Sequence, residues 1–226
     1  MDLGGFSIFV SGFPRSGTSM VMRMLNKGQV PILWKEHQGH ISEWDPHGIY
    51  EFKDVASELS SHAADWTANK AVKLVSIYLA DWLPLDRPTK VIFTLRDQTE
   101  IITSLLAKRL IISEDITGSI NEARRYLEQH RIPVLYLQYR EVLKYPKTAA
   151  IQIANFLEAD LDTAEMAKAI DRDVRTRKAK DLGPLISMRA EDYMGHIELR
   201  VNLNKETIQK LREEGVDVPG YQTNAR

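Results

Sequence analysis

The chain has 226 residues and a net charge of −1, with 43% hydrophobic and 27% charged residues, which is ordinary globular composition and excludes a disordered chain. This charge balance does not indicate a nucleic-acid or anionic-membrane partner, so any anion site has to be local. The absence of cysteine excludes disulfides, thiolate metal sites and a cysteine nucleophile. Because the N-terminus lacks the features of a signal peptide and no apolar run is long enough to span a membrane, we expect a soluble, cytoplasmic protein.

Short apolar runs alternate with helical patterns through the first two thirds of the chain. We expect strands at 6–11, 30–34, 89–95 and 132–139 and part of another in 70–79, with helices ending near 26 and at about 52–63, 99–111, 118–130 and 146–159. Strands separated by helices imply a parallel sheet with crossover helices, hence a three-layer α/β fold. Ligands of such sheets bind at the carboxyl ends of the strands, so the loops after 6–11 and 89–95 are expected to share one site.

The segment "GFPRSGTS" (12–19) follows the first expected strand and precedes the first expected helix. Gly12 and Gly17 have the G-x-x-x-x-G spacing of a P-loop, and Ser19 takes the place of the Ser/Thr in that motif. A glycine loop between a strand and a helix presents backbone N–H groups at the helix N-terminus, where they bind an anion. The loop therefore predicts a phosphate site in a P-loop-type domain.

Two residues distinguish this loop from those that bind ATP or GTP. Thr18 stands where a lysine normally reaches the β- and γ-phosphates, which weakens the case for a triphosphate. Arg15 adds a forked cation suited to phosphate or sulfate oxygens, and the hydroxyl groups of Ser16, Thr18 and Ser19 add donors.

With these features the loop resembles the one that, in sulfotransferases, grips the 5′-phosphosulfate of 3′-phosphoadenosine 5′-phosphosulfate (PAPS). A second likeness is "VIFTLRDQTEIITS", where Arg96 closes an expected strand and Ser104 follows eight positions later, as in the family's 3′-phosphate motif. A third is "VLYLQYREVLKYPKTAAIQIANFL", in which Tyr139 matches the position whose ring lies near the adenine in many members. The likeness covers roughly residues 6–160, and "WDPHGIYE" and "KAVKLVS" resemble segments of small bacterial-type sulfotransferases.

The resemblance implies a PAPS-dependent sulfotransferase that moves a sulfuryl group to a hydroxyl or amine and releases adenosine 3′,5′-bisphosphate, with no metal required. It implies one sulfotransferase-like domain over 1–226, with a nucleotide-binding core in 1–160 and a helical extension in 161–226. Arg15 is the candidate for stabilising the leaving oxygen. The implied cofactor-binding residues are Phe13, Pro14, Arg15, Ser16, Gly17, Thr18, Ser19, Arg96, Ser104 and Tyr139.

An acceptor hydroxyl also needs a base within hydrogen-bond reach. Glu36 follows the expected strand 30–34, where glutamate-type sulfotransferases place their base, so it is the first candidate. Glu43 and Glu51 are close rivals, because the polar segment between them can fold over the same pocket. The weaker candidates are His37, His40 and His47.

Two other readings remain open. One is a P-loop kinase-like enzyme with a degenerate loop, which would require magnesium and a lysine recruited from Lys35 or Lys73. The other is a non-catalytic nucleotide-binding module that has lost its base. The acceptor is expected to be a small molecule or a carbohydrate, but the sequence identifies neither it nor the oligomeric state.

Overall fold

The computed structural model describes residues 3–33, 64–107 and 115–170. These residues belong to two compact units. The first unit contains the described residues up to Arg96 and from Ser119 onward, and the second contains those between Asp97 and Gly118. Within the described ranges, no helix is both long and apolar enough to cross a membrane.

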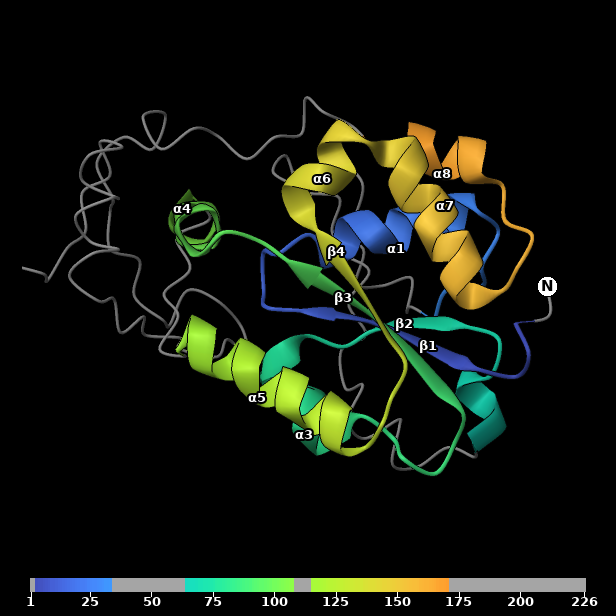
Figure 1. Cartoon of the computed structure of the whole chain (residues 1–226), viewed down its shortest axis with the longest axis horizontal. Coiled ribbons are helices and arrows are strands. Elements are labelled where there is room, and N and C mark those ends of the chain that lie inside the picture. Colours follow the sequence, from blue (N-terminus) through green and yellow to red (C-terminus); the bar gives the residue numbers. More distant parts are fainter. Residues whose placement is uncertain (1–2, 34–63, 108–114, 171–226) are drawn as a thin grey trace, which may run out of the picture. The chain divides into compact units, whose positions relative to one another are not determined.

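The first unit is built on a parallel sheet of four strands in the order β2-β1-β3-β4 (Figure 1). The strands are β1 Ser7–Gly12, β2 Ala71–Lys73, β3 Thr89–Leu95 and β4 Val134–Gln138. β1 and β3 pair along their length, from Ser7 with Thr89 to Gly12 with Thr94. Because all four strands run in the same direction, their carboxyl ends lie at one edge of the sheet, where β1 leads into the glycine loop.

Helices cover both faces of this sheet. Those of the first unit are α1 Thr18–Lys27, α3 Leu79–Trp82, α5 Ile116–Gln129 (from Ser119 onward), α6 Tyr139–Lys144, α7 Pro146–Leu157 and α8 Thr163–Lys168, with the 3₁₀ helices η2 Ala64–Thr67 and η3 Ser76–Tyr78. α1, α6, α7 and α8 lie on one face, and α3 and α5 lie on the other (Figure 1). The helix α4, Gln98–Ala107, belongs to the second unit.

Alternate residues of the strands form two separate hydrophobic clusters. Ile8 and Val10 of β1 pack with Ile92 of β3 in the cluster below α1 and α7. Phe9 and Phe93 point the other way and pack with residues of α3 and α5. Both faces are buried, which explains why these strands are continuous apolar runs in the sequence. The expected three-layer α/β fold with a central parallel sheet is therefore confirmed.

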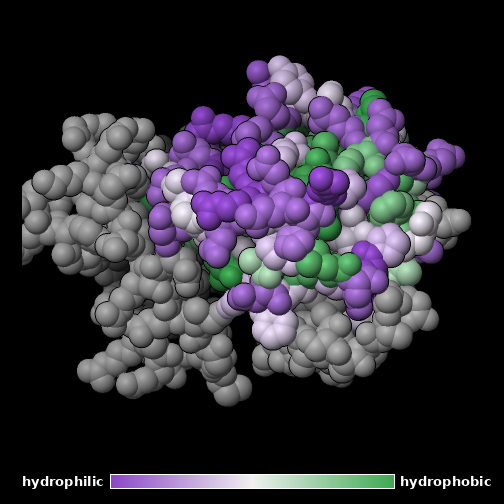
Figure 2. Space-filling view, turned by 60° about the horizontal axis from the view of Figure 1, so that its bottom comes forward, coloured by the Kyte–Doolittle hydropathy of each residue, from purple (hydrophilic) through white to green (hydrophobic). Residues whose placement is uncertain are grey.

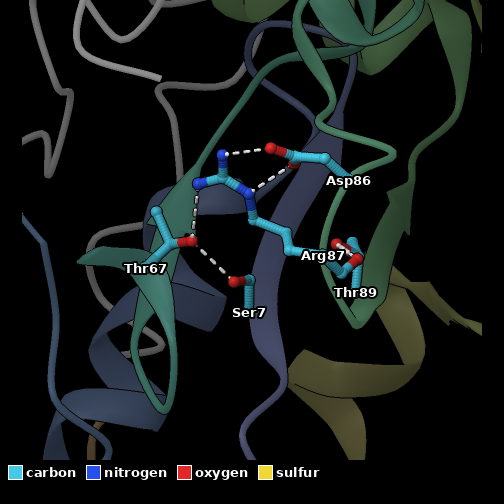
Figure 3. Close-up of polar contacts among 5 residues, drawn as sticks. All are labelled: Ser7, Thr67, Asp86, Arg87 and Thr89. Carbon is cyan, nitrogen blue, oxygen red and sulfur yellow. Dashed lines mark hydrogen bonds and ion pairs between the residues drawn. The ribbon is translucent and has the colours of Figure 1, made fainter. Parts of the chain in front are cut away.

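A polar cluster closes the amino-terminal edge of the sheet (Figure 3). Arg87, whose side chain is almost fully buried, donates from Nε and Nη2 to the two carboxylate oxygens of Asp86, at 2.8 and 3.1 Å. Its Nη1 donates to Thr67 Oγ1 at 3.3 Å, and this hydroxyl lies 2.6 Å from that of Ser7. The cluster lies opposite the glycine loop along β1, so it supports the sheet without taking part in the site.

The expected strand at 30–34 is wrong for the part that is described, since this segment forms only an isolated bridge between Ile32 and Ala71. Its ladder consists of two bonds, from the Ala71 N–H to the Pro31 carbonyl and from the Leu33 N–H to the Ala71 carbonyl. Pro31 has no N–H to donate, and the N–H of Val30 is bonded to Leu25 at the end of α1. The strand beside β1 is instead β2, which lies within the expected 70–79.

The other expected boundaries that fall within the described residues agree closely except at the end of β4, and the end of the expected helix 99–111 lies outside the described residues. The strand stops at Gln138, and Tyr139 starts α6 rather than ending the strand. The expected helix at 52–63 lies outside the described residues. In the expected helical extension 161–226, α8 is described, and everything after 170 lies outside the described residues.

Figure 2 shows a surface on which hydrophilic residues predominate and hydrophobic residues form small patches between them. The large hydrophobic side chains exposed in the described ranges are Trp82, Leu85, Tyr136, Tyr145 and Ile151. Exposed apolar side chains in this number are normal on a globular protein.

Candidate functional site

The loop after β1 contains a tight turn with an unusual residue in it. The N–H of Ser16 donates to the carbonyl of Phe13 at 2.9 Å, which closes a four-residue turn. Pro14 is the second residue and Arg15, with φ 72°, is the third. This is the pattern of a type II turn, whose third residue needs a positive φ and is normally glycine. The loop therefore places an arginine where its backbone is strained.

The same loop delivers the N-terminus of α1. Gly17, with φ 109°, is the N-cap residue, and no side chain among the described residues caps the helix. The first N–H groups of a helix have no intrahelical acceptor, and they carry the positive end of the helix dipole. An anion in front of Thr18 and Ser19 would therefore meet backbone donors and a favourable field.

Ser16 is a structural residue of the loop rather than an outward-facing donor. Its hydroxyl lies 2.7 Å from the hydroxyl of Thr94 on β3. Thr94 donates its single hydroxyl hydrogen to the carbonyl of Ser11 at 3.1 Å, so Ser16 must be the donor in the bond between the two hydroxyls. Both the N–H and the O–H of Ser16 are thus used inside the protein.

The two glycines of the motif are required by close contacts. A Cβ on Gly12 would overlap Thr94 Oγ1 and lie 2.5 Å from Ser16 Oγ. A Cβ on Gly17 would lie 2.7 Å from Cδ2 of the Tyr139 ring. The loop is therefore packed against β3 on one side and against the start of α6 on the other.

Lys73 brings a cation to the loop from a different strand. It is the last residue of β2, pairs with Val10 of β1 and is only 7% exposed. Its Nζ donates to Ser19 Oγ at 3.3 Å. An ammonium group thus reaches the first turn of α1 although the loop itself has Thr18 in place of lysine. The sequence carried one signal for this role, a lysine directly after two apolar strand residues.

Arg96 and Tyr139 complete the described part of the site. Arg96 directly follows β3, and its Nη1 donates to the backbone carbonyl of Arg15 at 2.8 Å. Its guanidinium lies over the ring of Tyr139, with Cζ 4.1 Å from the ring centroid. The arginine at the end of β3 and the tyrosine after β4 therefore contact each other and the loop.

The structure brings together most of the cofactor-binding residues expected from the sequence, namely those of the loop, Arg96 and Tyr139. The ring of Phe13 is fully buried in the core, which leaves its backbone as the part facing the loop. Ser104 lies on α4, in the second unit, so its pairing with Arg96 stays a prediction. The base candidates Glu36, Glu43 and Glu51, with His37, His40 and His47, lie outside the described residues.

No three side chains of His, Asp or Glu in the described ranges gather where they could hold a metal ion. The groups positioned around the loop in the described part of the chain are cations and N–H donors. This set suits an anionic ligand.

No protein-family model and no curated protein sequence matches the chain. Among solved structures, it is similar to mouse sulfotransferase SULT7A1 complexed with PAP, with 16% identity over 95% of this chain and 84% of that one and a TM-score of 0.51. It is also similar to the sulfotransferase domain of the Synechococcus PCC 7002 olefin synthase (17% identity, 94% and 95% covered, TM-score 0.47) and to one from the curacin biosynthetic pathway (16%, 95% and 99%, 0.48). The likeness to the mouse structure shows the fold, which is the P-loop-type α/β fold of a sulfotransferase.

Proposed function

We propose that this protein is a PAPS-dependent sulfotransferase that transfers a sulfuryl group to a hydroxyl or amine of a small molecule or carbohydrate. The observation that carries the proposal is the convergence of Lys73 and Arg96 on one glycine loop, which contains Arg15 and has no lysine of its own. The fold shared with a mouse sulfotransferase complexed with PAP supports a donor of this type.

The residues present fit the two charged ends of such a donor. The 5′-phosphosulfate would lie against the N–H groups at the start of α1, with Arg15 and Lys73 beside it. The 3′-phosphate would be held by Arg96 and Ser104, and Tyr139 would face the adenine. The geometry of the loop and the resemblance in sequence support these positions.

The donor supplies an activated sulfuryl group, whose transfer leaves negative charge on a phosphate oxygen. Arg15 and the N–H groups of the loop stabilise that charge, in the way that fixed donors stabilise oxyanions in other transferases. Lys73, at the end of β2, would bind the oxygens of the transferring group. These residues act through position and charge and need no proton transfer.

Removal of the proton from the acceptor falls to one of Glu36, Glu43 or Glu51. Glu36→Gln should abolish turnover while leaving the affinity for adenosine 3′,5′-bisphosphate unchanged, because the carboxylate acts on the acceptor and not on the nucleotide. Turnover retained in Glu36→Gln would transfer the role to Glu43 or Glu51, which the same substitution tests in turn.

The position of Lys73 also favours a second candidate, a kinase-like enzyme in which this lysine replaces the one missing from the loop. The two functions differ in their nucleotide. Thermal unfolding with adenosine 3′,5′-bisphosphate and with ATP plus magnesium separates them, because a ligand at about 100 times its Kd adds ~2.7 kcal/mol to the stability of the folded state. We expect a rise in Tm with the bisphosphate. A rise with ATP and magnesium alone would favour the kinase, and binding without any transfer to a panel of acceptors would favour a nucleotide-binding module.

A further inference from the structure

One residue of the loop has a backbone conformation that needs external support. Arg15 occupies the position of a type II turn where glycine is usual, with φ 72°. A residue with a side chain stays in this region only when its surroundings hold it there. The supporting contact should therefore be found on the backbone of Arg15 itself.

Arg96 makes that contact. Its Nη1 donates to the Arg15 carbonyl at 2.8 Å, and stacking over the Tyr139 ring restricts the guanidinium plane. The ring of Tyr139 in turn packs so closely on Gly17 that no side chain fits there. The Arg96–Tyr139 pair thus contacts the loop at its strained turn and at the N-cap of α1.

We propose that Arg96 is a positioning residue for the loop 12–19, in addition to the 3′-phosphate contact assigned to it under the proposed function. A guanidinium has five N–H donors in a fixed fork, so it can donate to a carbonyl and to a phosphate at the same time. A phosphate bound to Arg96 would hold its guanidinium in the position from which it donates to the Arg15 carbonyl. The 3′- and 5′-ends of the nucleotide therefore bind cooperatively, and nucleotides without a 3′-phosphate meet a less ordered loop.

The test combines a variant that lacks the Arg96 guanidinium with a nucleotide that lacks the 3′-phosphate. Adenosine 3′,5′-bisphosphate and AMP, which lacks the 3′-phosphate, are titrated by calorimetry into the wild type, Arg96→Gln and Arg124→Gln. Arg124 is the matched control, because it also stacks on a tyrosine, Tyr136, at 4.9 Å. We expect Arg96→Gln to weaken AMP binding about three- to tenfold through the loosened loop, and to weaken bisphosphate binding by more than about 100-fold. Unchanged AMP affinity in Arg96→Gln would confine this residue to the 3′-phosphate and overturn the positioning role.

A second measurement needs no ligand. Amide hydrogen exchange of the peptide covering 12–19 should be about three- to tenfold faster in Arg96→Gln than in the wild type and unchanged in Arg124→Gln. Equal exchange in Arg96→Gln and the wild type would overturn the proposal. If circular dichroism shows that Arg96→Gln does not fold, the Tyr139→Leu variant tests the positioning role instead. It removes the ring on which the Arg96 guanidinium stacks, so amide exchange in the loop should also become faster. A wild type that binds neither nucleotide would remove the proposed function, while the exchange comparison would still decide the positioning role.

Discussion

The hydroxyl groups of Ser16 and Thr94 lie 2.7 Å apart and join the glycine loop to the neighbouring strand β3. Both residues are almost inaccessible to water, with 1% of their surface exposed. Thr94 bonds in turn to the carbonyl of Ser11 at the end of β1. These two hydrogen bonds fix the position of the loop relative to β1 and β3. They therefore also fix the position of the first turn of α1.

Thr94→Val should lower the free energy of unfolding by about 1–3 kcal/mol, because the hydroxyl of Ser16 and the carbonyl of Ser11 then lose a buried partner. Thr94→Ser is the matched control. It keeps the hydroxyl and loses one methyl group, so it should lower the free energy of unfolding by only about 0.8 kcal/mol. Urea denaturation measures both values, and a valine variant at least as stable as the serine variant would contradict the bond assignment.

Arg15→Gly should lower turnover without lowering the stability of the folded protein. Glycine removes a left-handed strain of about 1–2 kcal/mol and costs ~0.5–1 kcal/mol in conformational entropy, so stability should stay equal or rise by up to about 1.5 kcal/mol. Turnover should fall about 100-fold or more, because the cation at the leaving oxygen is lost. Calorimetric Tm and initial rates test the two parts, and a clear loss of stability would contradict the strain at Arg15.

Gly17→Ala should destabilise the protein by more than Gly5→Ala does. Both glycines have positive φ, 109° and 73°, but only at Gly17 would a Cβ meet another side chain, the Tyr139 ring at 2.7 Å. We expect about 1–2 kcal/mol for the backbone alone and ~1–3 kcal/mol more for the overlap. In a Tyr139→Ala background the extra cost should disappear. If it persists there, the ring contact is not its cause.

Lys73→Met should lower turnover about 100-fold, since the cation beside the transferring group is lost while the apolar stem of the side chain is kept. The affinity for adenosine 3′,5′-bisphosphate should change little, because this product has no sulfuryl group. Lys70→Met is the control, as Lys70 donates to the Trp66 carbonyl at 2.8 Å and not to the loop. Equal turnover in Lys73→Met and Lys70→Met would show that Lys73 takes no part in the transfer.

Asp86→Asn should lower stability at neutral pH and not at acidic pH. The hydrogen bonds from Arg87 hold the pKa of the Asp86 carboxyl below its usual value. A lowered pKa in the folded state stabilises above the pKa of the unfolded chain, about 3.9 for Asp, and this contribution is lost as the pH falls through the folded value. Because the carboxylate is 64% exposed, we expect a difference of only ~0.5–1 kcal/mol at pH 7. Urea unfolding at pH 7 and near pH 3 checks whether the two proteins converge in acid.

Much of the fold could be predicted because its strands are buried on both faces and appear as apolar runs. The run 89–95 matches β3 at both ends, and the glycine loop is where its motif indicates. The prediction for 30–34 was wrong because its apolar residues surround Pro31, whose missing N–H keeps the two-bond ladder with Ala71 from extending past it. β2 has only three residues, so its extent depends on pairing with β1 rather than on local pattern.

The types of residue in the candidate site were visible in the sequence, but their contacts were not. Lys73 and Ser19 are 54 residues apart, and Arg96 and Arg15 are 81 apart, so their meeting depends on the register of three strands. The sequence also could not show that Ser16 uses its donors internally. This follows only from the position of Thr94 under the loop.

The shape of the loop after β1 depends on contacts from all the remaining strands of the sheet. These contacts come from Lys73 at the end of β2, Thr94 on β3 and Tyr139 directly after β4. Such non-local contacts form late, because the intervening chain must first be brought together. Nucleotide affinity should therefore be the last property regained on refolding from urea, after helical signal and compactness have returned. A fluorescent nucleotide added during refolding would then report the moment at which β4 joins the sheet.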